Sequence, residues 1–255
     1  MAAMDGKFAA AWDDYAARSK PPAGRWPGDE WGDERLWSAW FARLFEPHGV
    51  ATWRRAIEIG PGAGKYTARV LDAAPQVELL ALDVSERFQE LCRQRFSKEV
   101  TQGRLLLARI DERDDRAVAS AAAQVGWSGE VDALYSIDTL VHLTLHQLAA
   151  LLLGATEALR EGGWFIGTFA DGTSPAGLRK LVSDVPRVLA ANGDPASGCF
   201  HWSSPQAITA LAQYCGYDVV LCDLDPEHRR DGHFVLRYAN AAVAAAARAL
   251  REGGS

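Results

Sequence analysis

Residues 54–70 read RRAIEIGPGAGKYTARV, and they give the strongest indication of the fold class. A short apolar run carrying one acid, Glu58, is followed by glycines at positions 60, 62 and 64. The segment 65–74 after them has the apolar pattern of an amphipathic helix. A strand, a glycine turn and a helix form the unit with which open α/β sheets bind ligands at the carboxyl ends of their strands. The turn is therefore the first candidate binding site.

Short β-rich segments alternate with amphipathic ones along the rest of the chain. This alternation indicates a mostly parallel sheet covered on both faces, so the predicted fold is a doubly wound α/β fold with seven strands. The predicted strands are 56–60, 77–84, 104–111, 131–138, 164–170, 217–225 and 233–239. The predicted helices between and after them are 65–74, 85–96, 116–126, 145–163, 204–216 and an alanine-rich terminal one.

Two regions fall outside the alternation. Residues 1–53 hold six of the nine tryptophans, which predicts an amino-terminal helical and aromatic cap. Residues 171–204 place Gly, Pro and Ser around one helical segment, 176–191, which predicts an insertion after the fifth strand near the active site. We therefore expect a core of residues 54–240 between this cap and a carboxyl-terminal helix or tail of residues 241–255.

The composition excludes several classes of protein. With 255 residues and 48% hydrophobic content the chain can bury a full core. A net charge of −6 gives no general attraction to nucleic acid or to an anionic membrane. No apolar stretch is long enough to span a bilayer, and the start MAAMDGKF lacks a signal sequence, so a cytoplasmic protein is predicted. The four scattered cysteines favour buried thiols over a metal site.

Two phosphate-binding alternatives can be tested against the glycine turn. A P-loop would need glycine where Ile59 stands and Ser or Thr where Tyr66 stands, so it is excluded. A dinucleotide would need its third glycine where Lys65 stands, because the spacing here is GxGxG. Asp83, nineteen residues beyond Gly64, is nevertheless placed like a ribose-binding acid. An NAD(P)-dependent oxidoreductase therefore stays open as an alternative, as does a non-catalytic nucleotide-binding relative.

The acid before the turn favours a third ligand. Glu58 would repel a pyrophosphate but suits a ligand with an ammonium group. S-adenosylmethionine has an ammonium, a sulfonium, a ribose and an adenine, and no phosphate. The sequence EIGPGAG resembles motif I of the class I S-adenosylmethionine-dependent methyltransferases, which implies a Rossmann-like fold.

Later segments resemble the other motifs of this family in the same order, over residues 54–238. They are LLALDVS, LLLARID, DALYSIDTLVHL, ALREGGWFIGTF and FHWSSPQAITALAQYCGYDVV. The resemblance implies that Asp83 binds both ribose hydroxyls and that Asp111 lies beside the adenine amino group. The expected cofactor-binding residues are Glu58, Gly60, Pro61, Gly62, Gly64, Tyr66, Asp83, Val84, Ile110, Asp111, Ser136, Ile137 and Asp138.

The same resemblance predicts the transfer of a methyl group from S-adenosylmethionine, without a metal. No NPPY-type tetrapeptide follows the fourth strand, where SIDT stands, and the charge does not suit nucleic acid. We therefore expect a small-molecule acceptor with an O or N nucleophile, as in natural-product biosynthesis, and a monomer or homodimer. His142 and His201 are the candidates for a general base.

The amino-terminal aromatics have two interpretations. Trp12, Tyr15, Trp26 and Trp31 could form a lid over the substrate pocket, and the nearby Asp29, Glu30 and Asp33 would then suit a cationic or amine-bearing acceptor. Alternatively, the tryptophans only anchor a helical cap by burying a large area. The candidate substrate-binding residues are Trp12, Tyr15, Trp31 and Trp202.

Overall fold

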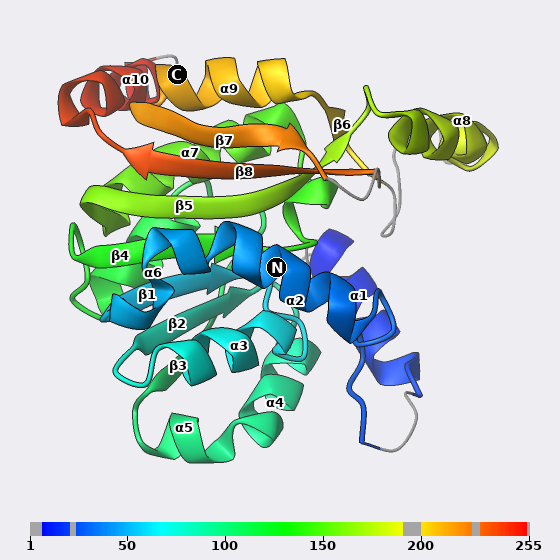
Figure 1. Cartoon of the computed structure of the whole chain (residues 1–255), viewed down its shortest axis with the longest axis horizontal. Helices are drawn as coiled ribbons and strands as arrows, with labels where there is room; N and C mark the ends of the chain where they lie inside the picture. Colours follow the sequence, from blue (N-terminus) through cyan, green and yellow to red (C-terminus); the bar gives the residue numbers. More distant parts are fainter. Residues whose placement is uncertain (1–6, 21–23, 191–199, 226–229, 254–255) are drawn as a thin grey trace, which may run out of the picture. The chain divides into compact units, whose positions relative to one another are not determined.

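The computed structural model describes residues 7–20, 24–190, 200–225 and 230–253 (Figure 1). The chain divides into two units, residues 1–114 and 115–255. The start of the chain and residues 191–199 of the predicted insertion, which include Cys199, lie outside the described residues.

The first unit is built on three parallel strands in the order β3-β2-β1 (Figure 1). These are β1 (Arg55–Ile59), β2 (Glu78–Asp83) and β3 (Leu105–Arg109). Helix α3 (Lys65–Ala73) connects β1 to β2, and α4 (Glu86–Arg95) with the short α5 (Ser97–Thr101) connects β2 to β3. Helix α4 packs against β2 and β3. The interiors of β1 and β2 are largely buried, as expected of parallel strands covered by helices.

Two helices and two short 3-10 turns precede β1: α1 (Lys7–Arg18), α2 (Glu34–Leu44), η1 (Glu46–His48) and η2 (Val50–Thr52). Asp33 caps α2 by accepting a hydrogen bond from the backbone N–H of Leu36 at 2.8 Å. Five apolar side chains of α2 are buried, namely Leu36, Trp37, Trp40, Phe41 and Leu44. Helix α2 is therefore part of the core of this unit.

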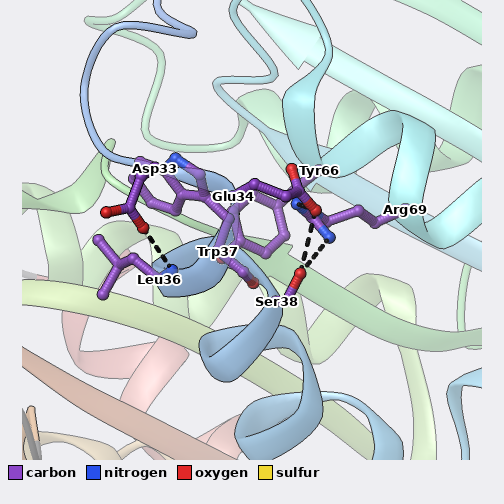
Figure 2. Close-up of polar contacts among 7 residues, drawn as sticks. All are labelled: Asp33, Glu34, Leu36, Trp37, Ser38, Tyr66 and Arg69. Carbon is purple, nitrogen blue, oxygen red and sulfur yellow. Dashed lines mark hydrogen bonds and ion pairs between the residues drawn. The ribbon is translucent and has the colours of Figure 1, made fainter.

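Consecutive turns of α3 hold α2 in place (Figure 2). The hydroxyl of Tyr66 donates to the carbonyl oxygen of Trp37 at 3.4 Å. One turn later, Arg69 forms an ion pair with Glu34 at 2.6 Å. The ammonium of Lys65 lies 4.1 Å from the centre of the Trp37 ring. The first turn of the helix that follows the glycines thus binds the segment that precedes β1.

The second unit contains the strand order β4-β5-β8-β7 (Figure 1). Strands β4 (Val131–Ser136) and β5 (Leu159–Asp171) are parallel, while β8 (Asp231–Tyr238) is antiparallel to both β5 and β7 (Tyr217–Leu224). A two-residue strand, β6 (Trp202–Ser203), pairs with the end of β5. The helical segments are α6 (Ala117–Gln124), η3 (Leu140–His142), α7 (Leu145–Ala158), α8 (Pro175–Ala190), α9 (Pro205–Tyr214) and α10 (Ala241–Gly253).

One predicted boundary is wrong. The helix expected over 145–163 ends at Ala158, and residues 159–163 belong to β5. Leu159 already pairs with Val131, and the register shifts between Val131 and Ala133. A Cβ on Gly163 would lie 2.9 Å from one carbonyl oxygen and 3.1 Å from another, so only glycine fits there. Gly162 and Gly163 therefore lie in an irregular part of the β4–β5 pairing and do not end a helix.

The protein has the predicted mixed α/β fold, with mostly parallel strands and helices around them. The seven predicted strands are present, and β6 is an eighth that the sequence did not indicate. No helix within the described ranges combines the length and the apolarity needed to cross a membrane.

Candidate functional site

The glycine turn between β1 and α3 depends on left-handed backbone conformations. Gly60, Gly62 and Gly64 have φ of 67°, 55° and 88°, which residues with a Cβ rarely adopt. A Cβ on Gly64 would lie 2.2 Å from the ring of Phe96, so this glycine allows the turn to pack beside α4. A Cβ on Gly62 would find just the ring of Phe88 within 4 Å among the described residues, at 3.8 Å. The backbone at Gly62 is therefore accessible to a ligand.

Glu58 lies near the end of β1, directly before the turn. Its side chain is buried, with a relative exposure of 3%. Its Oε2 accepts a hydrogen bond from the hydroxyl of Thr67 on α3 at 2.5 Å. Its carboxylate is thereby fixed beside the glycine turn, as a site for an ammonium group would require.

Asp83 ends β2 and is held by backbone donors. Its Oδ1 accepts from the N–H of Ser85 at 2.8 Å, and its Oδ2 accepts from the N–H of Gly62 at 3.3 Å. Burial raises the pKa of this carboxyl to about 7, although the backbone hydrogen bonds act in the opposite direction. A carboxylate can accept about four hydrogen bonds, so Asp83 has capacity for the hydroxyl groups of a ligand.

Three residues expected at the cofactor, Val84, Ile110 and Asp111, lie after β2 and β3. The carbonyl oxygen of Val84 accepts from the Nε of Arg109 at 3.2 Å, and the N–H of Ile110 donates to the carbonyl of Asp83 at 3.0 Å. Asp111 is exposed and forms an ion pair with Arg113 at 3.0 Å. The hydrogen bonds from Arg113 lower the pKa of the Asp111 carboxyl. The role of Asp111 toward a ligand stays a prediction.

Two further residues expected at the cofactor, Pro61 and Tyr66, are buried. Pro61 lies within the turn, where its carbonyl accepts from the N–H of Gly64 at 2.9 Å. The ring of Tyr66 packs against the rings of Trp37 and Phe45, and its hydroxyl contacts α2. These contacts are those of a core residue, so a direct contact of Tyr66 with a cofactor stays a prediction.

In the second unit, the end of β4 has an unusual backbone. Asp138 has a φ of 59°, and it is the one described residue other than glycine with a positive φ. Its N–H donates to the hydroxyl of the buried Thr168 on β5 at 2.8 Å. Residues held in this conformation cluster at functional sites. Ser136 and Ile137, which precede Asp138, are buried.

The two candidate bases belong to neighbouring segments of the second unit. The ring of His142 in η3 stacks on the ring of Phe200, with 5.4 Å between centroids and 15° between planes. The backbone N–H of His201 donates to the carbonyl of Val141 at 2.8 Å. The ring of Trp202 lies 5.7 Å from that of Phe200, so the segment around β6 and η3 brings both histidines and this tryptophan together.

The three aromatic candidates of the first unit form one cluster on α4. Tyr15 stacks on Trp31 at 4.9 Å, and Trp12 meets the edges of both at 5.9 and 5.8 Å. Trp12 and Tyr15 also lie 6.4 and 6.1 Å from Phe88. Buried Ala16, Ala63 and Phe88 pack with them. Helix α1 therefore lies against α4 and against the glycine turn.

The acids of this segment have structural partners. Glu30 accepts a hydrogen bond from the hydroxyl of Tyr15, and Asp29 accepts one from the backbone N–H of Trp26 at 3.0 Å. Asp33 caps α2. Lys65 donates to the carbonyl of Gly28 at 2.6 Å. These contacts fold the segment onto α3, and an amine-bearing acceptor stays a prediction from composition.

The sequence interpretation missed several residues that the structure brings to these places. They are Asp13, Ser85, Thr168 and Phe200. Asp13 stands between Trp12 and Tyr15 in α1, and Ser85 is a recognisable helix cap, so both had a local signal. The positions of Thr168 and Phe200 had none.

A metal centre has no candidate within the described ranges, where no group of three or more His, Cys, Asp or Glu side chains is placed to hold an ion. The described cysteines, Cys92, Cys215 and Cys222, are free thiols, and the first two are buried.

Comparisons with known proteins agree with this arrangement. Residues 57–165 match the family described as a methyltransferase domain. No curated protein sequence matches the chain.

Three solved structures share the fold. Magnesium protoporphyrin IX methyltransferase (ChlM) from Synechocystis PCC 6803, solved with bound SAH, is 13% identical, with coverage of 81% of this chain and 83% of its own and a TM-score of 0.54. The pyocyanin biosynthetic protein PhzM is 19% identical, with coverage of 80% and 55% and a TM-score of 0.55. Mitomycin 7-O-methyltransferase MmcR is 15% identical, with coverage of 79% and 55% and a TM-score of 0.56. The chain spans about half the length of the last two, and at these identities the likeness shows the fold alone.

Proposed function

We propose that this chain is a class I S-adenosylmethionine-dependent methyltransferase that transfers a methyl group to an O or N atom of a small molecule, which the match of residues 57–165 to a methyltransferase domain supports. The observation that carries the proposal is the pair of buried carboxylates at the glycine turn: Glu58 directly precedes the turn, and Asp83 accepts a hydrogen bond from the N–H of Gly62 within it. The three similar structures are named for protoporphyrin, pyocyanin and mitomycin chemistry, which supports a small-molecule acceptor.

The residues of the turn fit the parts of S-adenosylmethionine. Glu58 would hold the ammonium group, because a buried carboxylate is stabilised by an opposite charge. Asp83 would accept from the ribose hydroxyls, since its oxygens have acceptor capacity beyond the backbone donors. Gly62 would let the backbone approach the ligand. When bound, the cofactor supplies a methyl group on a positively charged sulfur.

Positioning is the main catalytic task that falls to the chain. Holding a nucleophile at attack distance and in line can lower the barrier by about 7 kcal/mol or more. Within the second unit, Asp138 and its neighbours at the end of β4 and the cluster of His142, Phe200 and Trp202 are our candidates for contact with the acceptor. A base is needed only where the nucleophile carries a proton, and His142 or His201 would take that proton.

The oxidoreductase alternative is disfavoured by two observations. The methyltransferase family match covers the turn region itself, from residue 57. Lys65 stands where the third glycine of a dinucleotide site belongs, and its side chain binds Gly28 and covers Trp37. A cytoplasmic location and a monomeric or homodimeric state remain predictions from the sequence.

Ligand-induced stabilisation tests the proposal. S-adenosylhomocysteine at about a hundredfold excess over its Kd should stabilise the protein by about 2.7 kcal/mol, because a ligand that prefers the folded state shifts the unfolding equilibrium. The measurement is the melting temperature with S-adenosylhomocysteine and, separately, with NAD. A rise with NAD and none with millimolar S-adenosylhomocysteine would reverse the assignment.

Replacement of the ribose-binding acid gives a second test. Asp83→Ala should weaken S-adenosylhomocysteine binding by roughly 1.5 to 3 kcal/mol, the usual contribution of hydrogen bonds to a charged group. Isothermal titration calorimetry at about pH 8, where the wild-type carboxyl is mostly ionised, measures the difference. Asp72→Ala, in an acid of α3 outside the proposed site, is the control. Equal affinity of wild type and Asp83→Ala would mean that the ribose is held elsewhere.

A further inference from the structure

Helix α1 contributes a carboxylate to the start of α4. The Oδ1 of Asp13 accepts a hydrogen bond from the hydroxyl of Ser85 at 2.5 Å and another from the backbone N–H of Arg87 at 3.0 Å. The Oγ of Ser85 also accepts from the N–H of Phe88 at 3.0 Å. Two acceptors that are 72 positions apart in the chain thus satisfy donors at one helix end. A second contact, from the N–H of Ala9 to Glu112 at 3.0 Å, fixes the beginning of α1.

Ser85 connects Asp13 to Asp83. Its backbone N–H donates to the Oδ1 of Asp83 at 2.8 Å, while its hydroxyl donates to Asp13. Ser85 and Asp83 are both buried. The position of Ser85 therefore determines the geometry of both hydrogen bonds. A change at Asp13 would therefore reach the Asp83 carboxylate through a single intermediate residue.

We infer that Asp13 is a positioning residue for the cofactor site, which holds Ser85 and through it orients the carboxylate of Asp83 toward the ribose hydroxyls. The inference rests on the proposed function, because it assigns Asp83 to the ribose. It extends the cofactor site to a helix that precedes β1 and that carries none of the family motifs.

The charge of Asp13 has a further consequence. The pKa of Asp83 is raised to about 7, first by burial and to a smaller extent by the negative charge of Asp13. Hydroxyl groups donate to the ionised carboxylate, so cofactor affinity should fall about tenfold for each pH unit below this pKa. Removing the charge of Asp13 should move the start of that fall to lower pH. Ionisable groups on the elements around Asp83 are Glu58 on β1, Cys92 and Glu86 on α4, and Arg109 on β3, whose guanidinium donates to the carbonyl of Val84 and pairs with Glu86.

The inference is tested by isothermal titration calorimetry of S-adenosylhomocysteine with four proteins. The titrations run from about pH 5.5 to about pH 8.5, on both sides of the pKa of Asp83. The proteins are the wild type, Asp13→Ala, Asp13→Asn and Asp14→Ala. Asp13→Ala should bind about tenfold more weakly at the alkaline end, because Ser85 loses its partner. Asp13→Asn should stay near the wild-type affinity there, since an amide oxygen also accepts from Ser85, and its affinity should begin to fall at a lower pH. Asp14, which pairs with Arg18 on the exposed side of the same helix, is the matched control.

The outcomes are distinct. Asp13→Ala that binds as tightly as Asp14→Ala at the alkaline end would overturn the positioning role. If Asp13→Ala does not fold, Ser85→Ala decides, because it keeps the backbone N–H that donates to Asp83 and loses the hydroxyl that donates to Asp13; wild-type affinity of this variant at the alkaline end overturns the inference. Wild type that binds no S-adenosylhomocysteine at any pH would instead refute the proposed function on which the inference rests.

Discussion

Gly64→Ala should lower the free energy of unfolding by about 3 kcal/mol and abolish the binding of S-adenosylhomocysteine. Two costs add at this position. The backbone has a φ of 88°, which an L side chain adopts only with strain. The new Cβ would also lie 2.2 Å from the ring of Phe96 and 3.2 Å from the sulfur of Cys92, so α4 must move away from the turn. Urea denaturation of the wild type and the variant measures the loss.

Gly103→Ala separates the two costs. Gly103 has a similar φ of 72°, but a Cβ there meets no described atom within 4 Å. This variant should lose about 1 to 2 kcal/mol, the cost of the left-handed backbone alone, and should keep its ligand affinity. If both variants lose the same free energy of unfolding, the ring of Phe96 moves aside at little cost, and packing beside α4 does not hold the turn.

Removal of residues 1–25 should leave a folded protein that binds S-adenosylhomocysteine more weakly and has lost most of its turnover, by about a hundredfold. The deleted helix carries Trp12 and Tyr15 of the aromatic cluster and the carboxylate of Asp13. Its contacts are with α4 and with the glycine turn, so it borders the cofactor site and does not contribute to the strand order. Circular dichroism, melting temperature and methyl transfer to an identified acceptor are the measurements.

The truncation is compared with a longer deletion and with two point variants. Removal of residues 1–45 should unfold the first unit, because the apolar face of α2 is buried in it. Trp12→Ala and Tyr15→Ala should each lower turnover with little change in melting temperature. Aggregation or much earlier melting of the shorter truncation would show that α1 is part of the core and would refute the interpretation of its aromatic residues as a lid.

Features of this protein that have a local sequence signal could be predicted without the structure. The strand, glycine turn and helix of residues 54–70 follow from a buried apolar run and from φ values that glycine alone adopts easily. The position of Asp83 at the end of β2 follows from the same logic, because a strand is a short apolar segment with a clear end. The alternation of short β-rich segments with amphipathic ones likewise predicted all seven main strands.

Contacts between segments that are distant in the chain could not be predicted and became visible in the folded structure. The helix predicted to end at Gly163 ends at Ala158, because β5 begins at Leu159 with a pairing to β4, and strand pairing is not visible in a local pattern. The contact of Asp13 with Ser85 spans 72 positions, and the stacking of His142 on Phe200 joins η3 to the segment before β6. Helical and strand periodicities show which face of a segment is buried, but not which partner buries it. The neighbours of Asp83, and hence its pKa, therefore depend on how the chain folds back on itself.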